Sequence, residues 1–562
     1  MIGYLRKRFD TNYLFACMIV ASTFLLSNCQ QKHEGKQGSK QLNIILMFTD
    51  ELQFSDIGAF GGNFPTPEID RLAREGLKFA KAYTPASMCT PSRFAALTGL
   101  YPGRCTAPTF LSQNPEDQPY NIAWNTWITP DLETLPEILG RNGYTTGMSG
   151  KWHVGHLPDS TKIPELHLED DPDDPEVENK LKIRQNIYKN QVKAGAGFDI
   201  AESVVWANFD NEPVEELRFH NFPWITRGAI RFLAQQKDSE KPFFLYVTPT
   251  AIHGPNHVKD LEKDKTYTPE GRQIDVLKYN LDEEKLKSEI KDLQAGKPHR
   301  YAGIANIDFQ LGLIRKKLEE IGKDKNTVII FISDHNIEPG KATSYEKGTN
   351  VPMIVYWPGI TTGQESSSLV SSLDIYPTIL DLAGIQKTDG LQLDGQSFLP
   401  VIHDPTTQNR EYVFSENGYT RSVTDGRFKY IALRYPERLI EAMKRGEIDY
   451  APSYVGNWPQ AHSAIAMKCF PAYFEQNQFY DLLNDPYEIQ NIYNEQDENV
   501  QYLKEVLEDH LATFTHPFDL NDILYLETDD FKRHSQVNLN YNLANIPWVR
   551  SDHGGFVWPP KE

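Results

Sequence analysis

The amino-acid sequence predicts an α/β protein with a largely parallel sheet, followed by a smaller α+β domain. Two observations predict the large domain. Short apolar runs typical of buried strands alternate with helical segments, and polar side chains directly follow four of these runs. A third observation, the alternating pattern over residues 412–435, predicts an antiparallel sheet in the smaller domain. We place the two domains at residues 42–402 and 403–562.

The first half of the large domain is predicted from apolar periodicity. Residues 43–49 are a short apolar run suited to a buried strand. Ile69, Leu72, Leu77 and Ala80 recur at helical spacing and predict a helix within residues 66–83. A second helix over 134–143 is stopped by glycine and leads into a strand over 144–149. The acidic stretch 168–180 predicts a solvated surface insertion, with a calcium-binding role as the minor alternative.

The second half continues the same alternation. The expected elements are a helix over 224–236, a strand over 242–249, an amphipathic helix over 302–322, a core strand over 327–333 and an apolar segment at 351–359. In the smaller domain, residues 500–514 have the spacing of a helix. This order of elements is that of a sheet with helices packed on it.

Charge and cysteine content exclude several classes of protein. The formal charge is 57 − 77 = −20, which argues against a nucleic-acid partner, because proteins that bind nucleic acid are usually basic. An anionic substrate would have to be attracted by a local pocket. The five cysteines do not form a disulfide framework, and we expect Cys105 and Cys469 to be two separate buried thiols rather than a pair.

The N-terminus is typical of an export signal. Arg6, Lys7 and Arg8 precede the apolar run 13–26, which is too short to span a bilayer comfortably. The following "LLSNC" resembles a bacterial lipoprotein lipobox, which implies that the thiol of Cys29 carries lipid. An ordinary secretory signal is the alternative. We place the signal peptide at 1–28 and a polar tether at 29–41, and expect an exported protein anchored by lipid alone to a bacterial membrane, in the outer membrane and periplasm or at the cell surface.

Charged and polar side chains gather where four predicted strands end. Asp50 and Glu51 follow the first, Lys151 and His153 the second, His253 the third, and Asp334 and His335 the fourth. Ligands of open α/β sheets bind outside the carboxyl ends of the strands, so this pattern predicts a single site. Its carboxylates suit calcium or, less well, magnesium. Zinc is disfavoured there because the sequence has no HExxH motif and no dense His/Cys cluster.

The stretch "SMCTPSRFAALTGLYPGR" at 87–104 places a cysteine at the start of a helix. Thr90 is suited to the N-cap and Pro91 to the first helical position, so Cys89 is expected at the positive end of the helix dipole, with Arg93 one turn further on. A buried structural cysteine and a thiolate nucleophile are both compatible with this position. Neither explains why a site for a hard metal ion should face a thiol.

The segment "CTPSR" resembles the Cys-x-Pro-Ser-Arg signature of type I sulfatases, members of the alkaline-phosphatase-like superfamily, in which the cysteine is converted to formylglycine (3-oxoalanine). The resemblance extends over most of the chain from residue 43. "NIILMFTDE" and "NTVIIFISDH" resemble the family's two metal segments, and "GYTTGMSGKWHVG" resembles its Lys-x-His segment. "FLYVTPTAIHGP" resembles its histidine strand, and "GKATSYEKGTNVP" its lysine segment. It implies a sulfuric ester hydrolase matured by a formylglycine-generating enzyme.

The resemblance also implies a role for each residue. One hydroxyl of the hydrated aldehyde at position 89 attacks sulfur, and the other is deprotonated so that sulfate is expelled. Calcium is held by Asp50, Glu51, Asp334, His335 and the modified residue 89. Arg93 steadies the hydrate, Lys151 and Lys341 bind sulfate oxygens, His153 is the base and His253 the acid. Glu51 departs from the family pattern, which has aspartate there.

The implied substrate is a sulfated oligosaccharide or polysaccharide, such as an algal galactan, ulvan, carrageenan or a glycosaminoglycan. Two alternatives remain. One is a phosphonate or phosphate ester hydrolase of the same fold. The other is a glycan-binding lipoprotein without catalysis, in which Cys89 stays a thiol. The intact set of charged positions argues against the second.

Overall fold

A computed structural model describes residues 41–521, apart from 158–160, 274–279, 292, 294–296, 338, 387–389, 446–465 and 467–468. Residues from Leu42 onward belong to one compact unit. The predicted signal peptide, the lipidation site Cys29 and the tether up to residue 40 lie outside the described residues. The boundary between domains at 402/403 remains a prediction.

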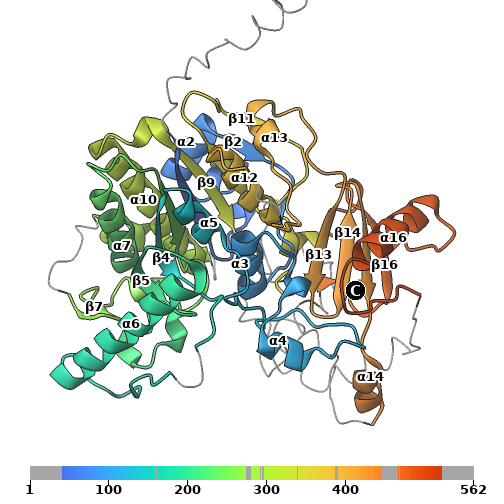
Figure 1. Ribbon diagram of the computed structural model, residues 1–562, viewed down its shortest axis with the longest axis horizontal. Helices are drawn as coiled ribbons and strands as arrows, with labels where there is room; N and C mark the ends of the chain where they lie inside the picture. Colours follow the sequence, from blue (N-terminus) through green and yellow to red (C-terminus); the bar gives the residue numbers. More distant parts are fainter. Residues whose placement is uncertain are drawn as a thin grey trace, which may run out of the picture. The chain divides into compact units, whose positions relative to one another are not determined.

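An eight-stranded sheet forms the centre of the fold (Figure 1). Its strand order is β11-β2-β10-β9-β1-β6-β4-β5. Neighbouring strands pair in parallel, except that β10 is antiparallel to both β9 and β2. The strands are β1 (Asn43–Thr49), β2 (Leu77–Phe79), β4 (Thr145–Lys151), β5 (Ile200–Val205), β6 (Phe243–Thr248), β9 (Thr327–Ser333), β10 (Met353–Tyr356) and β11 (Gln364–Ser366). The predicted α/β class with a mostly parallel sheet is confirmed.

Helices cover both faces of this sheet (Figure 1). The helices around it are α2 (Pro67–Glu75), α3 (Cys89–Thr98), α5 (Leu135–Arg141), α6 (Pro175–Ala196), α7 (Phe222–Gln235), α10 (Lys297–Glu320) and α12 (Ile375–Leu382). Shorter elements are α4 (Pro108–Gln113), α8 (His257–Asp260), α9 (Glu283–Ile290), α11 (Glu346–Thr349), α13 (Leu399–His403), β3 (Ala82–Tyr83), β7 (Tyr267–Thr268), β8 (Gly271–Arg272) and β12 (Val370–Ser371).

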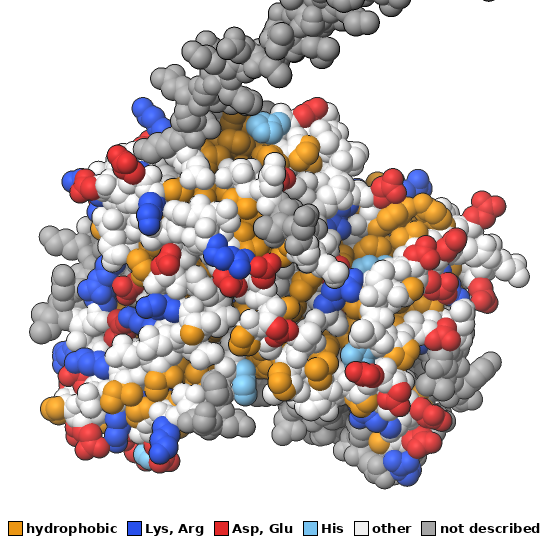
Figure 2. Space-filling view, viewed as in Figure 1, with side chains coloured by type: hydrophobic (Ala, Val, Ile, Leu, Met, Phe, Trp, Pro, Cys, Tyr) orange, Lys and Arg blue, Asp and Glu red, His pale blue; other side chains and the backbone are white. Residues whose placement is uncertain are grey.

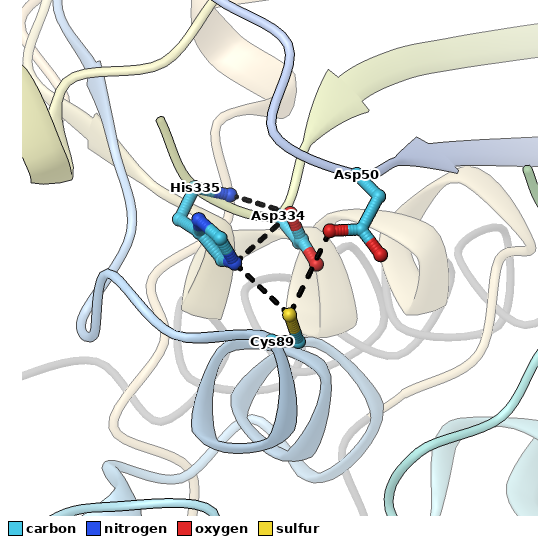
Figure 3. Close-up of side chains that lie close together, drawn as sticks. All are labelled: Asp50, Cys89, Asp334 and His335. Atoms are coloured by element: carbon cyan, nitrogen blue, oxygen red, sulfur yellow. Dashed lines mark hydrogen bonds and ion pairs between the residues drawn. The ribbon is translucent and has the colours of Figure 1, made fainter. Parts of the chain in front are cut away.

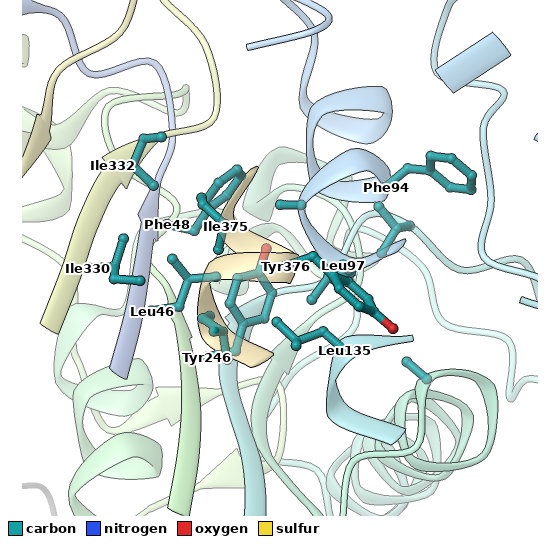
Figure 4. Close-up of a cluster of buried hydrophobic side chains, with 14 of the residues drawn as sticks. Leu46, Phe48, Phe94, Leu97, Leu135, Tyr246, Ile330, Ile332, Ile375 and Tyr376 are labelled. Atoms are coloured by element: carbon teal, nitrogen blue, oxygen red, sulfur yellow. The ribbon is translucent and has the colours of Figure 1, made fainter. Parts of the chain in front are cut away.

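The central strands bury both of their faces, which explains their continuous apolar runs. In β1, Leu46 and Phe48 join the core cluster that contains α3, α5 and α12, while Ile45 and Met47 join the cluster that contains α2, α7 and α10. Figure 4 shows the first cluster, where Phe48 and Tyr246 of the sheet lie with side chains from α3 and α12. This packing fixes α3, and with it Cys89, over the sheet.

One predicted element differs from the structure. The helix expected within 66–83 ends at Glu75, because the next residues leave the helix to pair with the sheet as β2 and then with β12 as β3. The acidic stretch 168–180 is mostly exposed, as expected of a solvated surface insertion. Asp174 accepts a hydrogen bond from the N–H of Glu176 and caps α6, so the last residues of the stretch are helical.

The C-terminal region contains a separate sheet of four antiparallel strands, as predicted from the alternating pattern. Its strands are β13 (Val413–Asn417), β14 (Thr420–Thr424), β15 (Phe428–Leu433) and β16 (Asn477–Asp481). Helix α16 (Glu498–Leu511) packs on it through Val500, Leu503 and Leu507, and α14 (Glu437–Lys444) follows β15. Cys105 and Cys469 are separate buried thiols and not a disulfide pair, as expected.

Acidic and basic side chains are interspersed over much of the face shown in Figure 2, and acidic ones gather over α16. The exposed acidic residues of that helix are Glu498, Glu505, Glu508 and Asp509. The negative formal charge is thus partly carried by the C-terminal region. Within the described residues, no helix has the length and apolarity needed to span a membrane.

Candidate active site

The four strands whose ends were predicted to form a site are neighbours in the sheet, in the order β9-β1-β6-β4. Thr49 pairs with Ser333 at the ends of β1 and β9, and Gly150 pairs with Thr248 at the ends of β4 and β6. The residue that follows β9 is held to β1, because the N–H of Asp334 donates to the carbonyl of Thr49 (2.9 Å). The strand register therefore sets the carboxylates of the first and fourth segments side by side.

Cys89 is the first residue of α3 and faces these carboxylates (Figure 3). Its Sγ lies 3.1 Å from Nε2 of His335 and 3.6 Å from Oδ1 of Asp50. The predicted cap was wrong by two residues, since Met88 and not Thr90 is the N-cap, with an extended backbone and no side-chain capping bond. Cys89 still lies at the positive end of the helix dipole, and its first turn is buried.

Asp50, Cys89, Asp334 and His335 form a buried group whose potential ligand atoms all lie within 4.8 Å of one another. Nδ1 of His335 is hydrogen-bonded to the carbonyl of Asn336 (2.7 Å), which assigns the proton to Nδ1 and directs the lone pair of Nε2 toward the group. Two carboxylates and an imidazole suit a divalent cation, and an oxygen at position 89 would suit a hard one better than sulfur. The donor set therefore fits the predicted metal ion.

Two buried cations, Arg93 and Lys151, form ion pairs with these carboxylates. Nη2 of Arg93 is 2.9 Å from Oδ2 of Asp334 and 3.4 Å from Oδ2 of Asp50, and Nζ of Lys151 is 2.5 Å from Oδ2 of Asp50. Burial opposes the ionisation of Asp50, but Lys151 and Arg93 outweigh it and hold the pKa of this carboxyl well below its ordinary value. Asp50 is therefore ionised near neutral pH.

Glu51, Lys341 and His253 form a second group beside the first. The carboxylate of Glu51 forms an ion pair with Lys341 and lies 3.8 Å from Nε2 of His253. Glu51 has a left-handed backbone (φ 60°), so its side chain leaves the strand end in a different direction from that of Asp50. The structure does not bring Glu51 into the four-residue group. Its predicted role as a metal ligand remains untested, and the geometry favours contact with Lys341.

His153 follows Lys151 by two residues and also has a left-handed backbone (φ 58°). Its N–H donates to the carbonyl of Trp206 (2.9 Å), while Nδ1 makes no hydrogen bond among the described residues. Burial, together with the charges of Lys151 and Arg93, lowers the pKa of His153 well below its ordinary value. A neutral imidazole with an unpaired nitrogen is a suitable proton acceptor.

Comparison with known proteins identifies this arrangement. The family profile described as "Sulfatase" matches residues 42–385. The chain belongs to the sulfatase family. A second profile, for the C-terminal region of N-sulphoglucosamine sulphohydrolase, matches residues 340–431. The activity is therefore hydrolysis of sulfate esters, in the alkaline-phosphatase-like superfamily.

Named relatives are similar to the chain over most of its length. An N-acetylgalactosamine-6-O-sulfatase of Bacteroides thetaiotaomicron is 26% identical, over 86% of this chain and 96% of the relative. The N-acetylgalactosamine-6-sulfatase of Mus musculus is 28% identical, over 69% of this chain and 71% of the relative. A solved sulfatase structure from work on glycosaminoglycan metabolism by Bacteroides thetaiotaomicron has a TM-score of 0.57, at 22% identity over 84% of this chain and 99% of its own, and supports the fold.

The sulfatase site is also held by two hydrogen bonds that the sequence analysis did not predict. Oδ1 of Asn417, at the end of β13, accepts a hydrogen bond from the N–H of Ser87 (2.7 Å), two residues before Cys89. The hydroxyl of Ser92 donates to the carbonyl of Asp334 (2.6 Å). The C-terminal sheet thus helps to hold the segment that leads into α3. Nothing in the local sequence around Asn417 indicates this contact, which joins residues 330 positions apart.

Proposed function

We propose that this sulfatase removes sulfate from a sulfated carbohydrate, with formylglycine made from Cys89 as the nucleophile and calcium as the bound ion. The observation that carries the proposal is the position of Cys89. It lies at the start of a buried helix, against two carboxylates and an imidazole, with Arg93 and Lys151 close by. A thiol has no evident purpose there, whereas an oxygen nucleophile beside a hard cation does.

The neighbouring residues support the sulfuryl-transfer chemistry of this proposal. Hydrated formylglycine at position 89 would offer one hydroxyl to sulfur and would release sulfate when the other hydroxyl is deprotonated and the aldehyde re-forms. Lys151 and Lys341 would neutralise the sulfate oxygens, and Arg93 would hold the hydrate. His253, beside Lys341, would protonate the leaving oxygen as the sulfur–oxygen bond breaks. His153, neutral and unpaired at Nδ1, would accept the proton of the second hydroxyl.

Asp50, Asp334 and His335 would hold the metal ion together with residue 89. When bound, calcium would lower the pKa of the hydrate and offset the negative charge of the sulfate group. Calcium is favoured over zinc because two carboxylates and an oxygen at position 89 form a mainly oxygen set. Magnesium is the weaker alternative.

The relatives favour a 6-O-sulfated amino sugar as the substrate, since the named ones act on N-acetylgalactosamine-6-sulfate by their names. Turnover should be measured on the 6-sulfates of N-acetylgalactosamine and N-acetylglucosamine, N-acetylgalactosamine-4-sulfate, and carrageenan and ulvan oligosaccharides. We expect N-acetylgalactosamine-6-sulfate to be turned over at least tenfold faster than the others. Activity on the algal oligosaccharides alone would refute this substrate but leave the sulfatase assignment intact.

The nucleophile is tested by mass spectrometry of the tryptic peptide of residues 82–93, from protein made in its own host. We expect an aldehyde in place of CH2–SH at residue 89. An unmodified thiol in active protein would refute the mechanism. Parallel assays with aryl sulfate and aryl phosphate esters separate a sulfatase from a phosphate or phosphonate hydrolase, and a Cys89→Ala chain with full turnover would also contradict the proposal.

We further propose that the protein is exported and held to a bacterial membrane by lipid on Cys29. The positive, apolar and cysteine-ended order of residues 6–29 supports this proposal. Labelled palmitate should be incorporated into the wild-type chain and into a Cys17→Ala variant, which changes a leader cysteine outside the lipobox. A Cys29→Ala variant should incorporate none. Equal labelling of the two variants would refute lipidation at Cys29.

A further inference from the structure

A second cluster of potential metal ligands lies beside the active site and takes no part in the chemistry above. His220, His257 and Asp260 are buried, with relative exposures of 1%, 1% and 4%, and their potential ligand atoms lie within 4.8 Å of one another. The His220 and His257 rings lie with centroids 4.1 Å apart. His220 precedes α7, whereas His257 and Asp260 are the first and last residues of α8. The cluster therefore joins two separate segments of the chain.

Several polar atoms of this cluster make no hydrogen bond in the described part of the chain. They are Nε2 of His220, both ring nitrogens of His257, and Oδ2 of Asp260. Buried polar atoms almost always have a partner, because leaving one unpaired costs about 1–3 kcal/mol. Nδ1 of His257 and Oδ2 of Asp260 lie 3.3 Å apart without the geometry of a hydrogen bond. Unpaired atoms on three neighbouring buried side chains point to a ligand that these atoms share.

The surroundings hold the two rings in orientations suited to a metal ion. Nδ1 of His220 is hydrogen-bonded to the hydroxyl of Thr250 (2.6 Å), which leaves Nε2 to face the cluster. Such a bond to the second ring nitrogen is the usual support of a metal-bound histidine. The His257 ring packs against α10 at Gly303, where a Cβ would lie only 2.8 Å from Cδ2 of the ring. Gly303 therefore allows the close approach that fixes this ring.

We propose that His220, His257 and Asp260 bind a zinc ion at a second metal site, distinct from the calcium site. Two imidazoles and one carboxylate are typical zinc ligands, and three protein ligands leave one tetrahedral position for water. Calcium would need six to eight oxygens, which this cluster does not offer.

The zinc ion would clamp the loop that carries His253. This loop runs from the end of β6 to α8, so Thr250 and His257 lie on either side of His253. Thr250 is held by His220, and His257 would be held through the metal to the same residue. The site would act by positioning, because none of its three ligands belongs to the groups that contact the sulfate in the mechanism above.

Cobalt(II) is a suitable probe, since it binds zinc sites and absorbs visible light. The test uses a full-length Cys89→Ser chain in millimolar calcium, so that the active-site carboxylates are occupied and no thiol competes. We expect one cobalt ion per chain, with the visible absorption of a four- or five-coordinate site, displaced by zinc. Zinc at about a hundred times its Kd should also raise Tm by about 2–3 °C. Absence of both effects would overturn the proposal.

Variants assign the signal to the cluster. His220→Gln and His257→Gln should each weaken cobalt binding at least a hundredfold. His516→Gln, which changes another buried histidine with no contact to the cluster among the described residues, is the matched control and should bind normally. Unchanged cobalt affinity in His220→Gln would refute the site. So would loss of the cobalt signal in a Cys89→Ser/His335→Gln chain while the cluster variants keep it. If the cluster variants do not fold, the cobalt stoichiometry and zinc-dependent Tm of the Cys89→Ser chain decide the question.

Discussion

Replacing Lys151 with methionine should weaken catalysis and strengthen metal binding at the same time. Lys151 is fully buried, and its Nζ lies 2.5 Å from Oδ2 of Asp50. That carboxylate belongs to the proposed calcium site. The lysine therefore competes with the metal ion for the negative charge of Asp50. Methionine keeps most of the side-chain length and removes the charge.

The size of the effect follows from Coulomb's law. Two unit charges about 4 Å apart interact by roughly 4 kcal/mol at an effective dielectric constant of about 20. A divalent ion bound to Asp50 feels repulsion of at least that order from Lys151. If half of it remains after the site relaxes, about 2 kcal/mol, calcium binds about 30-fold more tightly. Loss of one preorganised cation should meanwhile lower kcat by about 10²–10³.

Calcium affinity is measured by isothermal titration calorimetry, and turnover by sulfate release. The matched control is Lys189→Met, which removes a lysine from an ion pair with Glu270 on another part of the fold. It should leave both quantities near their wild-type values. A merely damaged site would lose calcium affinity and turnover together. Weaker calcium binding in a folded Lys151→Met protein would therefore refute the proposed competition for Asp50.

Three further results are expected. Chelation should abolish turnover and calcium should restore it; full activity in excess chelator, with no metal in the protein, would contradict the proposed ion. If Glu51 acts through Lys341, Glu51→Gln should lower kcat/KM at least tenfold and change calcium affinity less than threefold, whereas a loss of affinity equal to that of Asp334→Asn would make Glu51 a metal ligand. Burial raises the pKa of Asp308 to about 7, although two backbone N–H groups oppose this. The folded chain therefore keeps a proton that the unfolded chain releases above about pH 4, and stability contributed by this group is lost as pH rises to 7. Urea unfolding should show wild type losing up to about 4 kcal/mol relative to Asp308→Asn between pH 4 and 8, and parallel profiles would refute this assignment.

Much of the fold could be predicted because its central strands are buried on both faces. Residues 44–48 and 328–332 are apolar without interruption, and the strands that contain them have the predicted bounds of 43–49 and 327–333. The helix expected within 66–83 was overextended, since Leu77 continues the helical spacing of Ile69 and Leu72. Pairing of β2 with β10 overrides that local pattern, and the partner lies far away in sequence. Periodicity alone contains no information about such a partner.

Four strand ends and one helix start were enough to predict which residues meet in the active site. Asp50, Asp334, His335 and Cys89 are adjacent because parallel strands end at one edge and α3 begins above it. The directions of individual side chains were not predictable in the same way. Glu51 follows Asp50 directly, yet its left-handed backbone turns it toward Lys341. The hydrogen bond from Ser87 to Asn417 depends on how the C-terminal sheet packs, which no local motif records.

The electrostatic design of the site links substrate binding to the metal. Arg93 forms an ion pair with Asp334, Lys151 with Asp50 and Lys341 with Glu51. These three cations are therefore already paired within the protein. The molecule as a whole is acidic and gives an anion no general attraction. The proposed divalent cation would therefore be the charge that shifts the balance toward attracting a sulfate ester. Because coupling between two ligands is reciprocal, a sulfated substrate must in turn tighten the hold of the site on its metal ion.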